Sequence, residues 1–382
     1  MMIANKYLPE DIVKEILLRL DVKSLRRFEC VCKSWKTLIR RPSFVNNHFK
    51  RQPSSVILFH FSPAFDHNLK EFKFDCEVSC YSDCFDKLIQ RREILPSEFL
   101  RLEGCDNGVV CFGDFFNHDN ICLWNPATNE FKTLPPPPPP PCHSEHPTCL
   151  LGFGFDSLTD DYKVVRVFST DSYLFTSDSE LSVYNLGRNS WKRMEMSRVL
   201  SSSLPEFSSH VWANPDHRCS VVVKESINWN MSFQIDNEKK KSILAFDLNS
   251  EVIKTINLPQ LVEYKDLFLD KLSERLSLVV THDRNAPIFD VWVMKEYGVS
   301  DSWIKQVKVD LVNYPGELPP QLHGIGNKSS QPLAFGCKGN VLILESDEKV
   351  ILYDLESHKA EYLCPSMCIE IVCTTLESVL HL

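Results

Sequence analysis

The sequence predicts an α+β multidomain protein, in which a small all-helical N-terminal domain precedes a large all-β, propeller-like repeat domain. We place the helical domain at residues 1–50 and the β domain at residues 51–382. Three observations support this division. The hydrophobic period changes from helical to strand-like near Ser54, the net charge changes sign, and one hairpin pattern recurs along the second part.

Length and composition describe an ordered chain. The 382 residues are 43% hydrophobic and 24% charged, which is enough for a sizeable core. There is no run of eighteen apolar residues, and Met1–Asp11 lacks the apolar stretch of a signal peptide. We therefore expect no membrane insertion, and a cytoplasmic location with the nucleus as the alternative. The 15 cysteines follow no disulfide framework and are expected to be reduced.

The charge is divided unevenly between the two parts. Residues 1–50 contain 11 Lys+Arg and 5 Asp+Glu, a net charge of +6. Subtracting these from the whole-chain totals of 42 and 51 leaves 31 and 46, a net charge of −15 for residues 51–382. The acidic body argues against nucleic acid as a partner and suits a cationic protein.

The first fifty residues read as three or four short helices. Pro9, at the start of the first helix, precedes one apolar stripe made of Ile12, Val13, Ile16, Leu17 and Leu20. Asp21 can cap a second helix, and Ser43–Phe49 forms a short last one. Helices this short bury little core, so the domain is expected to need a partner to cover its remaining apolar surface.

A strand, a turn and a second strand recur along the body. Each copy has an aromatic anchor, and the anchors are Trp124, Tyr184, Phe246, Trp292 and Tyr353, at intervals of 60, 62, 46 and 61 residues. A hairpin that repeats every 45–60 residues, often after another hairpin, matches a four-stranded propeller blade.

Five copies are visible, and closure of a propeller requires a further blade. We expect the strands at residues 55–75 to combine with a C-terminal strand, either Ile369–Cys373 or Leu376–Leu380. An open solenoid and a sandwich are the alternatives.

The motifs resemble those of a known family across almost the whole chain. The head resembles the F-box, through Leu8-Pro9-x-Asp11, Glu15–Leu20 and Val31–Ile39. The body resembles the plant F-box-associated domain, through segments such as Trp124-Asn-Pro-Ala-Thr128 and Gly152–Asp156. Within that class the chain is similar to S-locus F-box and S-locus F-box-like proteins.

This resemblance implies the substrate-recognition subunit of a Skp-cullin-F-box ubiquitin ligase. The expected partners are a Skp-type adaptor, through it a cullin, and a protein target, with basic S-locus ribonucleases as the favoured class. The residues that the motif assigns to the adaptor contact are Leu8, Pro9, Ile12, Ile16, Leu17, Leu20, Leu25, Val31, Cys32, Lys33, Trp35 and Leu38. The alternative for some, notably Leu20 and Leu38, together with Phe28, is that they fill the domain's own core.

Two other functions stay open. The chain could be an F-box binding protein that acts in assembly or regulation without degrading its ligand. It could also be a propeller enzyme such as a glycosidase, which would need a cluster of carboxylates at the channel mouth. We predict no catalytic residue, because no nucleophile elbow, metalloprotease helix or phosphate-binding lysine motif is present.

No cofactor or metal site is predicted. The groups Cys142-His143-x-x-His146-x-x-Cys149 and Cys76/Cys80/Cys84 lack the usual ligand spacing. We interpret Trp124, Trp292 and Trp303 as strand anchors rather than stacking platforms for a nucleic acid or a sugar. The inter-strand segments expected to recognise a target are the proline run 135–141, Ser169–Glu180 and Met196–Ser209.

Overall fold

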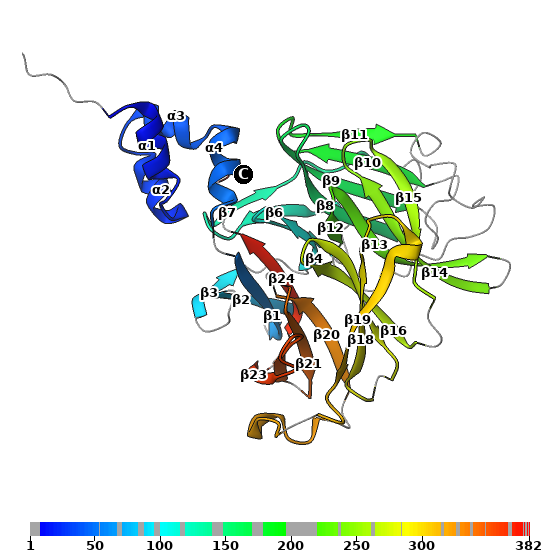
Figure 1. Cartoon of the computed structure of the whole chain (residues 1–382). Helices are drawn as coiled ribbons and strands as arrows, with labels where there is room; N and C mark the ends of the chain where they lie inside the picture. The colour runs from blue at the N-terminus through cyan, green and yellow to red at the C-terminus, as the bar shows by residue number, and fades with distance from the viewer. Residues whose placement is uncertain are drawn as a thin grey trace, which may run out of the picture.

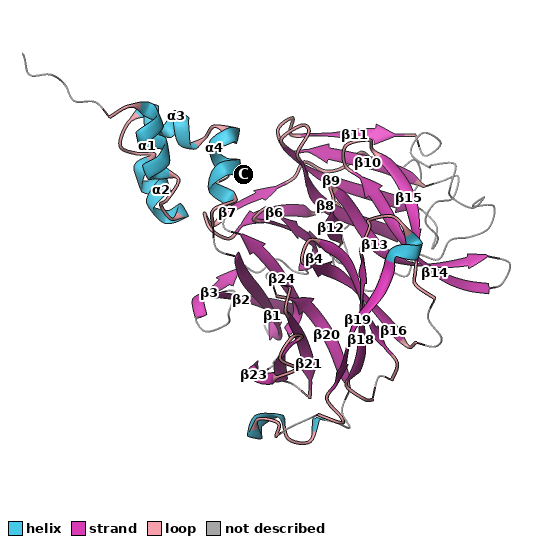
Figure 2. Ribbon diagram, viewed as in Figure 1, coloured by secondary structure: helices cyan, strands magenta, loops and turns pink. Residues whose placement is uncertain are grey.

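The computed structural model contains a four-helix head and a β-propeller body (Figures 1 and 2). We call residues 8–52 the head and the part from Ser54 onward the body. The residues that the structure describes are 8–52, 54–66, 71–82, 88–94, 100–114, 119–139, 148–169, 179–195, 220–235, 238–260, 264–283, 285–314, 317–325, 329–336, 339–347, 349–365, 369–376, 378, 380 and 382.

The head consists of four short helices. They are α1 (Glu10–Leu17), α2 (Val22–Phe28), α3 (Lys33–Ile39) and α4 (Pro42–Phe49). As predicted, Asp21 caps α2, because its carboxylate accepts a hydrogen bond from the backbone N–H of Ser24 at 2.8 Å. Helix α1 ends before Leu20, since the chain tightens there into i→i−3 hydrogen bonds that lead to the Asp21 cap.

The head has a small core of its own. Its buried members are Leu17, Leu18, Val22, Leu25, Leu38, Ile39 and Phe44. Phe28 and Trp35 pack against this cluster and meet edge to face, with ring centroids 5.5 Å apart. One body residue, Ala127, also contacts the cluster, so the head's core reaches the propeller.

The body is built from six four-stranded antiparallel sheets. From the innermost strand outward, blade 1 has β24 (Ile369–Leu376), β1 (Ser54–Asp66), β2 (Glu71–Ser82) and β3 (Leu88–Ile94), and blade 2 has β4 (Leu100–Asp106), β5 (Val109–Asp114), β6 (Ile121–Asn125) and β7 (Glu130–Thr133). In the same order, blade 3 has β8 (Thr148–Asp156), β9 (Asp161–Ser169), β10 (Glu180–Asn185) and β11 (Ser190–Met194), and blade 4 has β12 (Val221–Val223), β13 (Ser226–Ile235), β14 (Glu238–Asp247) and β15 (Val252–Asn257). Blade 5 has β16 (Asp266–Leu272), β17 (Arg275–Thr281), β18 (Ile288–Met294) and β19 (Trp303–Asp310), and blade 6 has β20 (Ser330–Phe335), β21 (Val341–Ser346), β22 (Lys349–Asp354) and β23 (Ala360–Pro365). Two short 3₁₀ helices, Ser300–Ser302 and Pro320–Leu322, lie in connections.

Blade 1 closes the ring by joining distant parts of the chain. β24 runs antiparallel to β1, with Ser54 opposite Leu376 and His60 opposite Ile369 (Figure 1). Innermost strands of neighbouring blades are in contact, including β24 with β4 and β20 with β24. The predicted closure through Ile369–Cys373 is therefore confirmed, and the open solenoid and the sandwich are excluded.

The five aromatic anchors occupy one equivalent position. Each lies on the third strand of its blade, namely β6, β10, β14, β18 and β22, and the predicted hairpins are the third and fourth strands. Their aromatic side chains fill the space between neighbouring blades; Tyr184, for example, belongs to the apolar cluster shared by blades 2 and 3. The repeat seen in the sequence is thus a repeat of blades.

Alternating strand directions give the propeller two faces. The head packs against the β6–β7 turn, and we call this side the head face. Strand ends that flank residues 140–147, 170–178 and 196–219 all lie on the opposite side, the far face. None of the helices within the described residues is long and apolar enough to cross a bilayer.

Candidate functional site

The predicted adaptor-contact residues separate into three groups by exposure. Leu17, Leu25 and Leu38 are buried in the head's core, and Leu20 and Trp35 are half-buried against it. The other seven are exposed, and we call them the adaptor surface: Leu8, Pro9, Ile12, Ile16, Val31, Cys32 and Lys33. Burial therefore places the three leucines inside the head, where they shape the surface from below.

Helix α1 divides its apolar residues between two faces. Ile12 and Ile16 lie one turn apart and are 48% and 49% exposed, whereas Leu17 is only 1% exposed. Residues i and i+4 share one side of a helix, so the two isoleucines form one ridge directed away from the core. Leu8, which precedes the helix, is 61% exposed. Apolar side chains in this arrangement are unusual on a surface that faces only water.

The turn between α2 and α3 adds a second apolar element. Val31 is 59% exposed, and Cys32 and Lys33 follow it on the surface. Cys32 precedes the first residue of α3, and its Sγ lies 3.1 Å from the Ser34 hydroxyl. That contact lowers the pKa of the Cys32 thiol, with a smaller contribution from the backbone N–H of Trp35.

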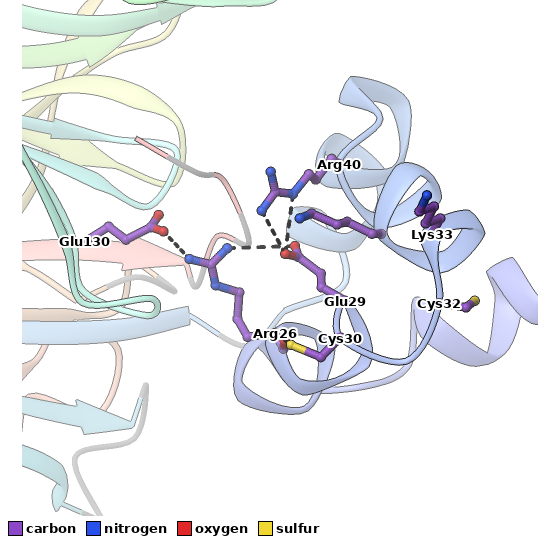
Figure 3. A pocket seen from close by; sticks show the side chains of 8 residues that line it. Arg26, Glu29, Cys30, Cys32, Lys33, Arg40 and Glu130 are labelled. Atoms are coloured by element: carbon purple, nitrogen blue, oxygen red, sulfur yellow. Dashed lines mark hydrogen bonds and ion pairs between the residues drawn. The ribbon is translucent and has the colours of Figure 1, made fainter.

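A groove of about 640 Å³ lies beside this turn, between α2, α3 and the body (Figure 3). It is lined by Arg26, Glu29, Cys30, Cys32, Lys33, Lys36, Arg40 and Glu130. The two carboxylates in the groove pair with arginines, because Arg40 contacts Glu29 at 3.1 Å and Arg26 contacts Glu130. Among the described residues no ion pair involves Lys33 or Lys36. The groove therefore offers two lysine ammonium groups to an acidic segment of a partner.

The predicted recognition segments lie only partly within the described residues. Residues 170–178 and 196–209 are outside them, as are Pro140 and Pro141 of the proline run. The strands that lead into these segments end on the far face, whereas the head occupies the other. The long inter-strand connections and the adaptor surface thus belong to opposite sides of the molecule.

The described part of the proline run is fixed to blade 3. The indole N–H of Trp191 donates to the Pro135 carbonyl at 2.8 Å, and the Arg193 guanidinium donates to the Pro139 carbonyl. Pro137 is buried, whereas Pro136 and Pro139 are exposed, a period of three that is typical of a polyproline II helix with one edge embedded. This segment is therefore a stiff, anchored connection.

Carboxylates on the innermost strands form contacts between blades. Asp106 on β4 accepts a hydrogen bond from the Phe155 backbone N–H at 2.8 Å, and Asp270 on β16 accepts one from Phe335 at 2.7 Å. Glu103 is ion-paired with Arg101 at 2.6 Å. Burial raises the pKa of Asp106 and of Glu103. Each of these described carboxylates has a structural partner in place.

The tryptophans belong to the blade cores, as predicted. Trp124 is 1% exposed, and the indole N–H of Trp303 donates to the Asn257 carbonyl at 3.0 Å. Trp292 packs against the apolar cluster between blades 4 and 5. No group of three potential metal ligands occurs within the described part of the chain. Cys142, His143, His146 and Cys84 lie outside it.

Sequence reasoning missed the contact between the head and the body. Arg26 and Glu130 form an ion pair across it, and Ala127 packs on the head's core. The available signal is the Asn125-Pro-Ala-Thr128 segment, a family motif whose structural role the sequence does not indicate. A single sequence does not indicate which hairpin turn faces another domain.

Family profiles cover both parts of the chain. A profile described as F-box domain matches residues 7–47, and one described as F-box associated beta propeller domain matches residues 61–375. Among curated proteins, F-box protein CPR1 of Arabidopsis thaliana is 27% identical over 377 residues, covering 94% of this chain and 86% of that protein. F-box/kelch-repeat protein At3g23880 of Arabidopsis thaliana is 27% identical over 314 residues, covering 79% of each.

Solved structures are more distant. The periplasmic gluconolactonase of Pseudomonas aeruginosa aligns with a TM-score of 0.38 and 10% identity, covering 81% of this chain and 82% of that one. A post-proline cleaving enzyme from Rickettsia typhi aligns with a TM-score of 0.36 and 11% identity, covering 81% and 45%. Likeness at this level carries no information about activity.

Proposed function

Because the chain belongs to the F-box proteins with an F-box-associated β-propeller domain, we propose that it is the substrate-recognition subunit of a Skp-cullin-F-box ubiquitin ligase. The observation that carries the proposal is the adaptor surface: exposed apolar residues gathered on a head that has only a small core. A Skp-type adaptor would cover this surface and link the chain to a cullin.

The proposed adaptor contact combines an apolar ridge with a basic edge. Leu8, Pro9, Ile12, Ile16 and Val31 would be desolvated by the adaptor, as apolar anchors at interface centres usually are. Lys33 and Lys36 at the edge of the groove would steer an acidic adaptor into place. The buried leucines Leu17, Leu25 and Leu38 contribute by supporting this surface rather than by direct contact.

The chain would act by proximity rather than by its own chemistry. A target bound on the body is held near the ubiquitin-conjugating enzyme, which raises the effective concentration of its lysines at the activated ubiquitin. The far face suits target binding, because the adaptor surface is on the head at the opposite side. Work in the cytoplasm or nucleus is consistent with this role.

We propose that the target is a basic protein. The net charge of −15 on residues 51–382 favours a basic protein, and the S-locus-like layout favours a basic S-locus ribonuclease. The second candidate function, an F-box binding protein that does not degrade its ligand, shares the adaptor surface. Proteasome inhibition separates the two, because it should raise the abundance of the bound protein only if that protein is degraded.

The test is capture of a Skp-type adaptor by the full chain. The Leu8→Ala/Pro9→Ala variant should lose most of the captured adaptor, because both side chains are exposed on the adaptor surface. Leu158→Ala is the matched control, since Leu158 is 76% exposed but lies on the body. Undiminished capture by the double variant would refute the proposed contact.

The same double variant can identify the target. Without the adaptor it should retain target binding but not promote degradation, so affinity purification from reproductive tissue should enrich the bound protein. We expect a basic protein whose retention weakens as salt rises. An acidic protein, or retention that is independent of salt, would contradict the ribonuclease assignment.

A further inference from the structure

We propose that the β6–β7 turn, residues Asn125–Glu130, sets the orientation of the head relative to the propeller, with Arg26 and Glu130 as positioning residues. The inference rests on the proposed function for its biological meaning. Its geometry is independent of that function. Four observations on the described residues support it.

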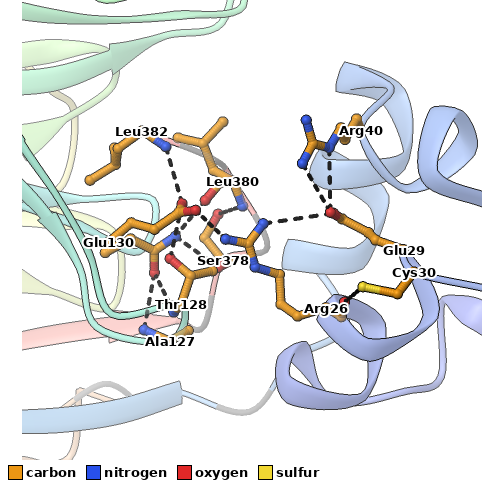
Figure 4. A network of polar contacts seen from close by, with 11 residues as sticks. Arg26, Glu29, Cys30, Arg40, Ala127, Thr128, Glu130, Ser378, Leu380 and Leu382 are labelled. Carbon is orange, nitrogen blue, oxygen red and sulfur yellow. Dashed lines mark hydrogen bonds and ion pairs between the residues drawn. The ribbon is translucent and has the colours of Figure 1, made fainter.

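Glu130 forms the ion pair between the two domains (Figure 4). Its partner Arg26 is on α2, and the two side chains are 23% and 31% exposed. Glu130 is itself held by the Thr128 hydroxyl and by the backbone N–H of Leu382, each at 3.3 Å. The carboxylate therefore meets Arg26 from a fixed position rather than from a freely rotating side chain.

Arg26 is fixed from the head side. Its guanidinium also lies 3.8 Å from Glu29, a buried residue that Arg40 contacts at 3.1 Å. Arg26 thus lies between one carboxylate of each domain, and Arg40 anchors the head's carboxylate. A connected set of charged side chains holds two domains in position better than an isolated exposed pair does.

Asn125 makes the turn rigid. Its side chain is fully buried, and its amide donates to the carbonyls of Ser378 at 3.0 Å and Leu380 at 2.8 Å. Its oxygen accepts the backbone N–H groups of Ala127 at 3.0 Å and Thr128 at 3.3 Å. One side chain therefore ties the turn to the segment after β24.

Apolar contact between the head and the body is concentrated at the same turn. Ala127 packs against the head's core. A cavity of about 290 Å³ is lined by Val45 and Phe49 of α4 and by residues of the β8–β9 and β10–β11 turns. Among the described residues, the β6–β7 turn therefore supplies both an apolar contact and an ion pair to the head.

This arrangement has a consequence for ubiquitin transfer. The head fixes the chain to the ligase, and the body holds the target, so the angle between them sets where target lysines lie. A small error in position lowers the effective concentration of a reacting group steeply. Arg26 and Glu130 would then affect transfer by setting this angle, although they also line the groove beside Lys33 and Lys36.

The test measures the orientation in the full chain. Genetically encoded spin labels at the exposed positions Lys23 and Lys254 report the distance between head and body. The unmodified chain should give one narrow distance distribution. Glu130→Arg or Arg26→Glu should each lose this single peak, and the charge-swapped Arg26→Glu/Glu130→Arg should regain it. Trypsin cleavage at Lys50 in the connection should rise about two- to five-fold in each single variant.

Glu356→Arg supplies the matched control, because Glu356 is an exposed acidic residue on another turn of the head face. It should leave the distribution unchanged, and circular dichroism checks that every variant is folded. An unchanged peak in Glu130→Arg, or a swap that restores nothing, would overturn the inference. Adaptor capture is measured in parallel, so a chain that captures no adaptor refutes the proposed function while the distance result stands separately.

Discussion

The head and the body differ in how their exposed apolar side chains are distributed. Leu8, Ile12, Ile16 and Val31 are all large, exposed and located within a short stretch of the head. The comparable residues among the described part of the body, such as Phe131 and Leu158, are single and lie on separate turns or edge strands. Single exposed hydrophobic residues are common on proteins, whereas a cluster marks an interface.

The difference follows from how each part is closed. In the body each sheet packs against its neighbours and β24 joins the ring, so both faces of each blade are covered without a partner. The head has four short helices and seven buried core residues, which leaves the outer side of α1 uncovered. The body is complete by itself, and the head is complete only when something covers α1.

The substitution with the largest expected effect disrupts the head's interface and leaves its core intact. Ile12→Asp/Ile16→Asp places charge on the exposed ridge, so adaptor affinity should fall by about 1,000-fold, the scale of two interface hot spots. The midpoint of thermal unfolding should stay close to that of the unmodified chain, because neither side chain is buried. Titration calorimetry with the adaptor checks the first expectation. A loss below tenfold would mean that the ridge is at the rim of the interface.

Leu17, the neighbour of Ile16, should affect the stability of the head rather than adaptor affinity. Leu17→Ala removes a side chain that is 1% exposed, so it should cost about 2–5 kcal/mol of the head's unfolding free energy. Chemical denaturation followed by the fluorescence of Trp35 measures this loss. If Leu17→Ala lowers adaptor affinity while the head stays fully stable, then Leu17 contacts the adaptor and our division of α1 is wrong.

A third change tests the tight packing of the body. A Cβ atom at Gly152 would lie 2.2 Å from the Trp229 ring, whose indole N–H is fixed by the Leu151 carbonyl at 2.7 Å. Gly152→Ala should therefore destabilise the propeller by about 1–3 kcal/mol. Gly298→Ala is the control: its φ is +84° but no neighbouring atom lies within 4 Å, so only backbone strain of about 1 kcal/mol is expected. Equal losses of unfolding free energy in Gly152→Ala and Gly298→Ala would show that blades 3 and 4 can move apart.

The smallest effect concerns the pH dependence of the head. His48 is buried beside the Leu20 carbonyl, with Nε2 2.7 Å from the oxygen, and burial lowers its pKa. The folded head then binds fewer protons than the unfolded chain. The contribution of His48 to the stability of the head is complete above the unfolded pKa of about 6.5, and it is lost as the pH falls through the lowered pKa of the folded state.

The slope from this one group cannot exceed about 1.4 kcal/mol per pH unit. Denaturation of the full chain between pH 7 and pH 5, followed at the head, should show it. His48→Gln should flatten the profile because its amide does not titrate in this range. A profile that keeps its slope in His48→Gln would assign the pH dependence to other groups.

The propeller could be predicted from the sequence because every blade has the same packing requirement. Trp124, Tyr184 and Phe246 recur because every third strand must fill the gap to the next blade. The strand that completes blade 1 was left with two options, since Ile369–Cys373 and Leu376–Leu380 are both apolar and β-rich. Pairing with Ser54–His60 decides in favour of the first. The sequence contains no local signal for a pairing between such distant segments.

The adaptor surface could be predicted only in outline. Helical periodicity identifies the apolar stripe of α1, but Ile16 and Leu17 look alike within it. Which of them is exposed depends on how α2 and α3 pack against α1, and that is tertiary information. For the same reason the Arg26–Glu130 contact was invisible, because it depends on the placement of two domains.

Blade 1 also sets an order of events during synthesis. β1 emerges from the ribosome early, but its inner partner β24 is made only after the other five blades. At about 5–20 residues per second, that delay is roughly 15–60 s. Throughout this interval the head has all of its residues, so it can fold and meet its adaptor while the propeller is still an open arc. A nascent chain could therefore join its complex before it is able to hold a target.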